Sequence, residues 1–150
     1  MNNENPFMGL GVALVTPFTA NGNIDWEKFA ELIEFQIENG TDYLCILGTT
    51  AETPTLTDDE KLKIVQSAIK QINGRIPIMV GCSSNCTAAV LNQIKQYEIE
   101  GVDGILTAVP YYNKPSQEGI YQHFKAIAEN CKKPIVLYNV PGRTGVNMTA

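Results

Sequence analysis

The stretch GTTAET at residues 48–53 carries more hydroxyl groups than a turn between a strand and a helix requires. Such a turn needs one glycine and one residue to cap the helix. Here Thr49 and Thr50 stand side by side directly after the apolar run YLCIL. Hydroxyl groups and loop N–H groups at the end of a buried strand are suited to binding a small carboxylate. We therefore expect this stretch to form part of a binding site.

Two further kinds of reactive side chain follow later apolar runs. Tyr111 and Tyr112 come after the run that ends at Val109, Tyr138 lies in the last run, and Arg143 follows it. A guanidinium can hold a carboxylate through two parallel hydrogen bonds, and a phenol can transfer protons. Each residue by itself has an ordinary explanation as rim packing or a solvated charge. Their convergence indicates a site for a small substrate that carries carboxylate groups.

Cysteine and histidine are too sparse to predict a metal site. The chain has four cysteines and one histidine, His123, whereas a structural zinc site needs about four ligands at close spacing. Cys82 and Cys86 have no second pair to complement them. We expect reduced thiols, with Cys45 acting as a small buried hydrophobe. We expect His123, beside the apolar stripe of a predicted helix, to be a surface or hydrogen-bonded residue rather than a catalytic one.

Five apolar runs alternate with four helical patterns. The runs, which predict strands, begin at Gly9, Tyr43, Ile76, Val102 and Pro134. The first two helices are predicted to begin after Asp25 and at the capping box Thr57–Glu60. The third is predicted to follow Thr87, with Asn85 or Thr87 as its cap, and the fourth to follow Ser116. The first three helices are predicted to end at Asn39, Asn73 and Gly101. The stripes predicted to face inward are Phe29, Leu32, Ile33 and Ile37; Leu62, Val65, Ile69 and Ile72; Val90, Leu91, Ile94 and Tyr97; and Ile120, Phe124 and Ile127.

This alternation indicates a parallel sheet covered by helices. A doubly wound sheet would carry a glycine-rich phosphate loop after its first strand, and Thr16-Pro17-Phe18 stands there instead. The pattern therefore favours a (β/α)8 TIM barrel, which needs about 250 residues. The 150 residues account for about five strands and four helices. We interpret residues 1–150 as the N-terminal part of a single barrel domain that leaves two long edge strands unpaired.

Composition and charge exclude some classes of partner. The formal net charge is −5, and no basic cluster is larger than Lys132-Lys133, which argues against a nucleic-acid partner. The apolar runs are too short to span a bilayer. The N-terminal segment MNNENPFMG has neither the basic nor the apolar region of a secretory signal. We expect a cytoplasmic protein without membrane contact.

Several longer motifs are similar to those of one known family. They are TPF at 16–18, GTTAET at 48–53, PYYNKPSQEGIYQHFKAIAE from Pro110, and YNVPGRTG from Tyr138. Through these motifs, which extend over almost the whole chain, the sequence resembles the dihydrodipicolinate synthase family of pyruvate-dependent aldolases. The resemblance implies a (β/α)8 barrel, a homotetramer built as a dimer of dimers, and no cofactor.

The resemblance also implies an activity and roles for individual residues. In that family a lysine forms a Schiff base with pyruvate, and the enamine attacks L-aspartate 4-semialdehyde on the route to diaminopimelate and lysine. The pyruvate carboxylate is assigned to Thr50, and the proton relay to Thr49, Tyr138 and Tyr112, the last from a neighbouring subunit. The carboxylate of the semialdehyde is assigned to Arg143, whose RTG context resembles the synthase rather than N-acetylneuraminate lyase-like relatives.

The sequence departs from the family pattern at the catalytic lysine and at one loop position. No predicted strand contains a lysine, and Lys114 lies in a polar loop. The Schiff-base lysine is therefore expected beyond Ala150, and the 150-residue chain alone is expected to be inactive. Ala51 replaces a glycine of the family, which would add strain only if this position had a positive φ.

A second departure concerns the site at which many family members bind lysine as an inhibitor. Asn85 and Tyr111 match that site, but the acidic position is Ala89 and the histidine position is Lys61. A cationic ligand would lose a carboxylate and meet a like charge. Weak or absent inhibition by lysine is therefore expected.

Two other interpretations stay open. A non-catalytic binding or assembly module would keep a carboxylate site near Thr50 without a nucleophile. Another pyruvate aldolase would act on a sugar acid rather than on aspartate semialdehyde.

Overall fold

The computed structural model describes residues 5–149 and contains one five-stranded parallel sheet. In chain order the elements are β1 (Gly11–Ala13), α1 (Trp26–Glu38), β2 (Tyr43–Ile46), η1 (Thr49–Ala51), η2 (Thr53–Thr55), α2 (Asp58–Ile72), β3 (Ile78–Gly81), α3 (Thr87–Tyr97), β4 (Gly104–Ala108), α4 (Gln117–Asn130), β5 (Ile135–Tyr138) and α5 (Pro141–Thr144). Each strand pairs with the one before it, giving the order β1-β2-β3-β4-β5. A doubly wound sheet would reverse direction at a switch point, so the predicted barrel arrangement is confirmed as part of a (β/α)8 barrel.

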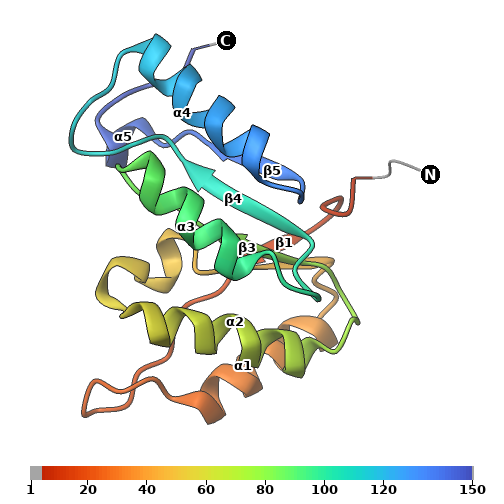
Figure 1. Cartoon of the computed structure of the whole chain (residues 1–150). Helices are drawn as coiled ribbons and strands as arrows, with labels where there is room; N and C mark the ends of the chain where they lie inside the picture. The colour runs from red at the N-terminus through yellow and green to blue at the C-terminus, as the bar shows by residue number, and fades with distance from the viewer. Residues whose placement is uncertain (1–4, 150) are drawn as a thin grey trace.

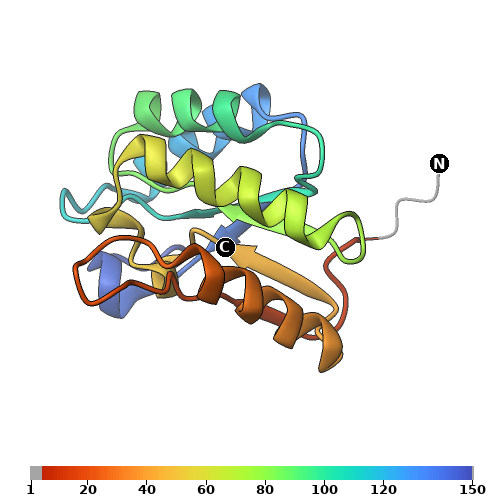
Figure 2. The same cartoon turned by 90° about the horizontal axis from the view of Figure 1, so that it is seen from below.

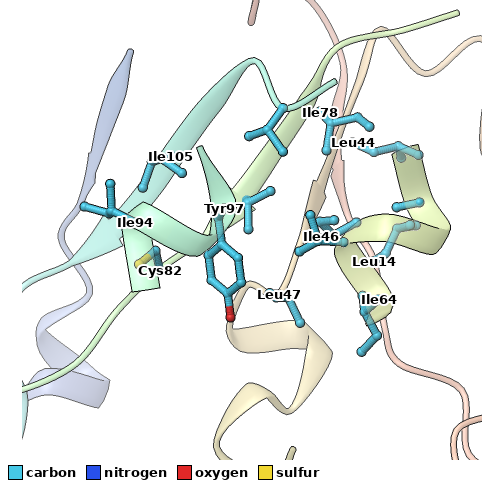
Figure 3. Close-up of a cluster of buried hydrophobic side chains, with 14 of the residues drawn as sticks. Leu14, Leu44, Ile46, Leu47, Ile64, Ile78, Cys82, Ile94, Tyr97 and Ile105 are labelled. Atoms are coloured by element: carbon cyan, nitrogen blue, oxygen red, sulfur yellow. The ribbon is translucent and has the colours of Figure 1, made fainter. Parts of the chain in front are cut away.

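The helices lie against the sheet (Figures 1 and 2). Leu44, Ile46, Ile78, Val80 and Ile105 are all buried, and Figure 3 shows several of them within one cluster of apolar side chains. Burial of such a side chain stabilises the fold by about 1.5–3 kcal/mol.

The predicted helix starts are confirmed by their capping bonds. The Asp25 carboxylate accepts a hydrogen bond from the Lys28 amide at 3.0 Å. Thr57 and Glu60 form the predicted capping box, and the Ser116 hydroxyl accepts from the Gly119 amide. Asn73 ends α2 in the left-handed conformation, as expected of a residue that follows the last helical turn.

The prediction for α3 was wrong at both ends. Cys86 is the N-terminal flanking residue and makes no side-chain capping bond, so neither Asn85 nor Thr87 caps the helix. The helix ends at Tyr97 rather than at Gly101. In α2 the buried residues include Ile64 and Ala68, which the predicted stripe omitted.

Short elements were also mispredicted. The helix α5 and the two 3₁₀ turns η1 and η2 were not expected, because segments of three or four residues are too short to show a helical period. The outer strands β1 and β5 contain only three and four residues, so the edges are shorter than predicted.

Among residues 5–149 the cysteines form no disulfide and belong to no cluster of potential metal ligands. All four cysteines are free thiols, and Cys45 is buried as predicted, with burial raising its pKa to about 11. No cluster of three or more potential metal ligands occurs among these residues. No helix in the same range is both long and apolar enough to cross a membrane.

The exit of β2 from the sheet depends on a close backbone approach. Leu47 turns the chain with a φ of 55°. Its carbonyl group then packs against Gly81 at the end of β3, where an added Cβ would collide with it. Only glycine leaves room for this contact, so Gly81 helps to set the path of the GTTAET stretch.

We predict that Gly81→Ala destabilises the protein by roughly 1–3 kcal/mol, because overpacking against backbone atoms cannot be relieved by a side-chain rotation. The free energy of unfolding in urea measures the change. Gly142→Ala is the matched control, because nothing lies within 4 Å of its added Cβ. Equal stabilities for the two variants would contradict the prediction.

His123 joins α4 to α3 from a buried position. Its Nδ1 lies 2.9 Å from the Thr87 hydroxyl, and its Nε2 is buried without a hydrogen-bond partner among the described residues. The ring also contacts Phe124 edge-on. Burial lowers the pKa of His123 below its usual value of 6.5. The residue is thus a partly satisfied core histidine that favours the neutral state.

We predict that the protein loses stability as the pH falls through about 6.5, because the unfolded chain then binds a proton that folded His123 resists. The stability is fully present above the unfolded-state pKa and decreases toward the lower folded-state pKa. Urea unfolding between pH 8 and pH 5 tests this, and His123 is the only histidine in the chain. The slope should disappear in His123→Gln. A slope that persists in this variant would assign the effect to another group.

Candidate active site

A cavity of about 300 Å³ lies at the rim where the strands end. Gly48 follows β2, and Gly81, Ala108 and Tyr138 end β3, β4 and β5, and all four residues line the cavity. The carboxyl ends of parallel strands are where barrel enzymes place their active sites. The polar segments selected from the sequence therefore meet at one place.

The GTTAET stretch uses some of its hydroxyl groups to hold its own shape. The Thr53 hydroxyl donates to the Gly48 carbonyl at 2.9 Å, and the Thr16 hydroxyl donates to the Ala51 carbonyl at 2.8 Å. Thr49 lines the cavity, and its hydroxyl makes no hydrogen bond within residues 5–149. Thr50 is exposed and does not line the cavity. Of the two adjacent hydroxyls, only Thr49 is thus placed to contact a ligand held within it.

Ala51 fits its position without backbone strain. It lies in η1 and is buried, and the positive φ values of this segment belong to Leu47 and Glu52, both 55°. The loss of the family's glycine therefore has no conformational cost here.

Tyr138 and Arg143 reach the cavity from β5 and α5. Tyr138 pairs with Ala108 in the sheet register, and both line the cavity. The turn beyond β5 is held by the Asn139 side chain, which donates to the Asn147 side chain at 2.8 Å and accepts from the Met148 amide at 3.1 Å. The Arg143 side chain makes no ion pair within the described residues, so its guanidinium is available to a ligand.

The two adjacent tyrosines point to different places. Tyr111 lines the cavity, whereas Tyr112 is 88% exposed and does not line it. Tyr112 also adopts a φ of 74°, which is strained for an aromatic residue. Asn85 is exposed and lies outside the cavity, where its carbonyl accepts a bond from the Asn113 side chain at 3.4 Å.

Several cavity residues were not expected from the sequence. Lys61, Gln93 and Tyr97 line the wall, although α2 and α3 were interpreted as covering helices. The capping box at Thr57–Glu60 was a usable signal, because it places Lys61 in the helical turn nearest the rim. Lys114, the lysine expected nearest the site, is exposed and does not line the cavity.

The charges around the cavity are all of one sign. Lys61 and Arg143 line it, and no aspartate or glutamate does so among residues 5–149. The chain as a whole is acidic, with a formal net charge of −5. Lys61 is paired with the Asp58 carboxylate outside the lining, at 3.0 Å, whereas Arg143 makes no ion pair within the described residues. The free guanidinium, together with the hydroxyls and phenols, therefore favours an anion.

Comparisons with known proteins agree with this geometry. Residues 6–150 match the profile of the Dihydrodipicolinate synthetase family. The chain is 63% identical over 142 residues to 4-hydroxy-tetrahydrodipicolinate synthase from Phocaeicola vulgatus, covering 95% of this chain and 48% of that protein. It is 59% identical over 142 residues to the protein of the same name from Parabacteroides distasonis, with the same coverage of both.

Solved structures give the same result. Dihydrodipicolinate synthase from Acinetobacter baumannii, complexed with pyruvate, superimposes with a TM-score of 0.92 at 45% identity, covering 94% of this chain and 48% of that one. The synthase from Cyanidioschyzon merolae, with lysine bound, gives 0.93 at 40% identity, covering 97% and 50%. The chain thus spans about half the length of the relatives it matches. The profile match and the identities show that the chain belongs to the dihydrodipicolinate synthetase family.

Proposed function

We propose that the protein carrying this chain condenses pyruvate with L-aspartate 4-semialdehyde to give 4-hydroxy-tetrahydrodipicolinate. The observation that carries the proposal is the meeting of Thr49, Tyr138 and Arg143 in one cavity lined by cations and by no acidic residue of the described chain. Both substrates carry a carboxylate, which such a cavity favours. The names of the relatives from Phocaeicola vulgatus and Parabacteroides distasonis support the same reaction.

The reaction begins when a lysine amine attacks the pyruvate ketone, releasing water and leaving an imine. Loss of a methyl proton gives an enamine, whose carbon attacks the aldehyde carbon of the semialdehyde. The amino group of the semialdehyde then closes onto the imine carbon and displaces the lysine. Every stage moves protons, so it needs a group that both donates and accepts.

The cavity residues take the following roles in this proposal. Tyr138 transfers protons to and from the intermediates, and Thr49 passes them along the cavity wall. Arg143 holds the carboxylate of the semialdehyde through two hydrogen bonds. Thr50 binds the pyruvate carboxylate from the rim, a role that requires its exposed side chain to turn toward the ligand.

Tyr112 completes the proton relay from a neighbouring copy in a homotetramer formed as a dimer of dimers. Its exposure and its left-handed backbone support this role, because both present the phenol away from its own cavity. A strained conformation of this kind costs about 1–3 kcal/mol and is kept where function requires it.

The Schiff-base lysine comes from outside residues 1–150. Lys61 is the lysine of the described residues that lines the cavity, but it forms an ion pair with Asp58 at 3.0 Å. A catalytic amine must be neutral to attack a ketone, and a carboxylate partner favours its charged form.

We predict that pyruvate and borohydride together trap a reduced adduct on a lysine outside residues 1–150 of the full-length protein. Peptide mapping by mass spectrometry locates it.

Tyr138→Phe should reduce the rate of condensation by roughly 10²–10⁴-fold, because a positioned proton-transfer group contributes that much.

An adduct on Lys61 or Lys114 would contradict the proposed origin of the nucleophile. Absence of both adduct and condensation would instead support a non-catalytic binding or assembly module. Turnover of a sugar acid without turnover of aspartate semialdehyde would assign the protein to another group of pyruvate aldolases.

We also predict that L-lysine inhibits the full-length enzyme weakly or not at all. Asn85, one of the two residues that match the family's lysine site, lies outside the cavity. Lys61 introduces a like charge where a histidine is expected, and Ala89 removes the carboxylate that a cationic ligand needs. The double variant Lys61→His, Ala89→Glu should gain sensitivity, whereas Lys63→His, on the exposed side of α2, should not. Half-inhibition of the wild type by sub-millimolar lysine would contradict this prediction.

A further inference from the structure

The helix α5 is too short to hold Arg143 in place by itself. It spans a single turn, Pro141–Thr144, and a helix of this length is not stable without contacts from outside. Arg143 lines the cavity from this turn, and its side chain makes no ion pair within residues 5–149 that could fix it. The position of the guanidinium therefore depends on the contacts that hold the backbone of α5.

The chain turns back directly after α5 and is held there by the Asn139 side chain. Gly145 makes the turn with a φ of 73°. The Asn139 side-chain oxygen accepts from the Met148 amide at 3.1 Å, and its NH₂ group donates to the Asn147 side-chain oxygen at 2.8 Å. Since a backbone N–H can only donate, the bond to Met148 fixes the orientation of the Asn139 amide. Asn139 thus ties the segment after α5 to the end of β5.

A second side chain holds the same segment from α4. Gln117, the first residue of α4, donates from its NH₂ group to the Asn147 carbonyl at 2.8 Å. Its side-chain oxygen accepts from both the amide and the hydroxyl of Thr149, each at 3.0 Å. Figure 1 shows the segment after α5 passing beside the start of α4. Two amide side chains from different parts of the fold therefore clamp residues 147–149, and each uses both its donor and its acceptor.

The clamp holds Arg143 without holding Tyr138. Tyr138 lies in β5, where it pairs with Ala108, and its carbonyl accepts a hydrogen bond from the Val109 amide at 3.3 Å. These contacts belong to the sheet and do not involve the clamp. The return of the chain after Arg143, in contrast, is held by the two clamping side chains. Loosening the clamp should therefore displace the guanidinium while the phenol keeps its place.

We propose that Asn139 and Gln117 are positioning residues that hold Arg143 where it binds the carboxylate of the aldehyde substrate. The inference rests on the proposed condensation, because it takes the guanidinium as the partner of that carboxylate. A loosened segment lowers the fraction of molecules in which the guanidinium is ready to bind, and the apparent affinity falls by that fraction. The clamp thus determines how well the semialdehyde binds and has no part in forming the pyruvate adduct.

The test compares the steady-state kinetics of the full-length protein with those of its Gln117→Met and Asn139→Leu variants. Both changes keep the approximate size of the side chain and remove its hydrogen bonds. Each should raise the KM for L-aspartate 4-semialdehyde by about tenfold, because several hydrogen bonds are lost. The kcat and the yield of the borohydride-reduced pyruvate adduct should change by less than about twofold, because the proton-transfer groups are not displaced.

A background without the guanidinium shows whether the clamp acts through it. In Arg143→Gln, the further change Gln117→Met should leave the remaining kcat/KM unchanged, because the group that the clamp positions is absent. Gln122→Met is the matched control, because this glutamine also lies on α4 but bonds to Glu118 of its own helix at 2.7 Å. It should leave the KM for the semialdehyde unchanged.

Hydrogen exchange tests the clamp without turnover. In Gln117→Met the backbone amides of residues 142–148 should exchange about tenfold faster or more, whereas those of β5 should not change. Unchanged exchange in this segment would overturn the proposal. Equal falls in adduct yield and in kcat/KM, or a further loss of kcat/KM in the Arg143→Gln background, would overturn it too. Absence of condensation in the wild type would instead contradict the proposed function, and the exchange rates would still decide whether the clamp holds α5.

Discussion

The parallel pairing of the strands is the constraint on which the site depends. Because all strands run in the same direction, their carboxyl ends meet at one rim, and side chains far apart in the sequence become neighbours there. One apolar cluster between the sheet and the helices holds the strands together. Gly81 adds a local condition, since its missing side chain lets the Leu47 backbone turn away from the sheet.

The hydroxyl groups of the rim fall into two groups with different tasks. Thr16, Thr53 and Thr144 donate to backbone carbonyls and hold the loops that surround the cavity. Thr49 and Tyr138 line the cavity and make no such bond within residues 5–149. A loop held by several hydrogen bonds presents its free groups in a fixed geometry, which reduces the ordering cost of binding a ligand.

Charge gives the cavity its selectivity. In this acidic chain the described residues that line the cavity include two cations and no carboxylate, and one of these cations, Lys61, is paired with Asp58 behind the wall. In such a space, charges interact more strongly than on the open surface, because less water screens them. Arg143 is the cavity cation of the described residues that makes no ion pair among them, so its charge is available to an anion. Tyr97 belongs both to the apolar core and to the cavity wall, because it is 2% exposed within the apolar cluster (Figure 3) and also lines the cavity.

The sequence by itself determined the order of strands and helices, the capping residues Asp25 and Thr57, and the rim positions of Thr49, Tyr138 and Arg143, because these follow from local periodicity and from where apolar runs end. It did not separate Thr49 from Thr50, or Tyr111 from Tyr112, because adjacent residues share the same local pattern and differ only in the direction set by the backbone. It also missed Lys61 and Tyr97 as cavity residues. Their roles arise from the packing of α2 and α3 across the ends of β2 and β3, which is a long-range contact that no local pattern encodes, and so only the tertiary structure decided them.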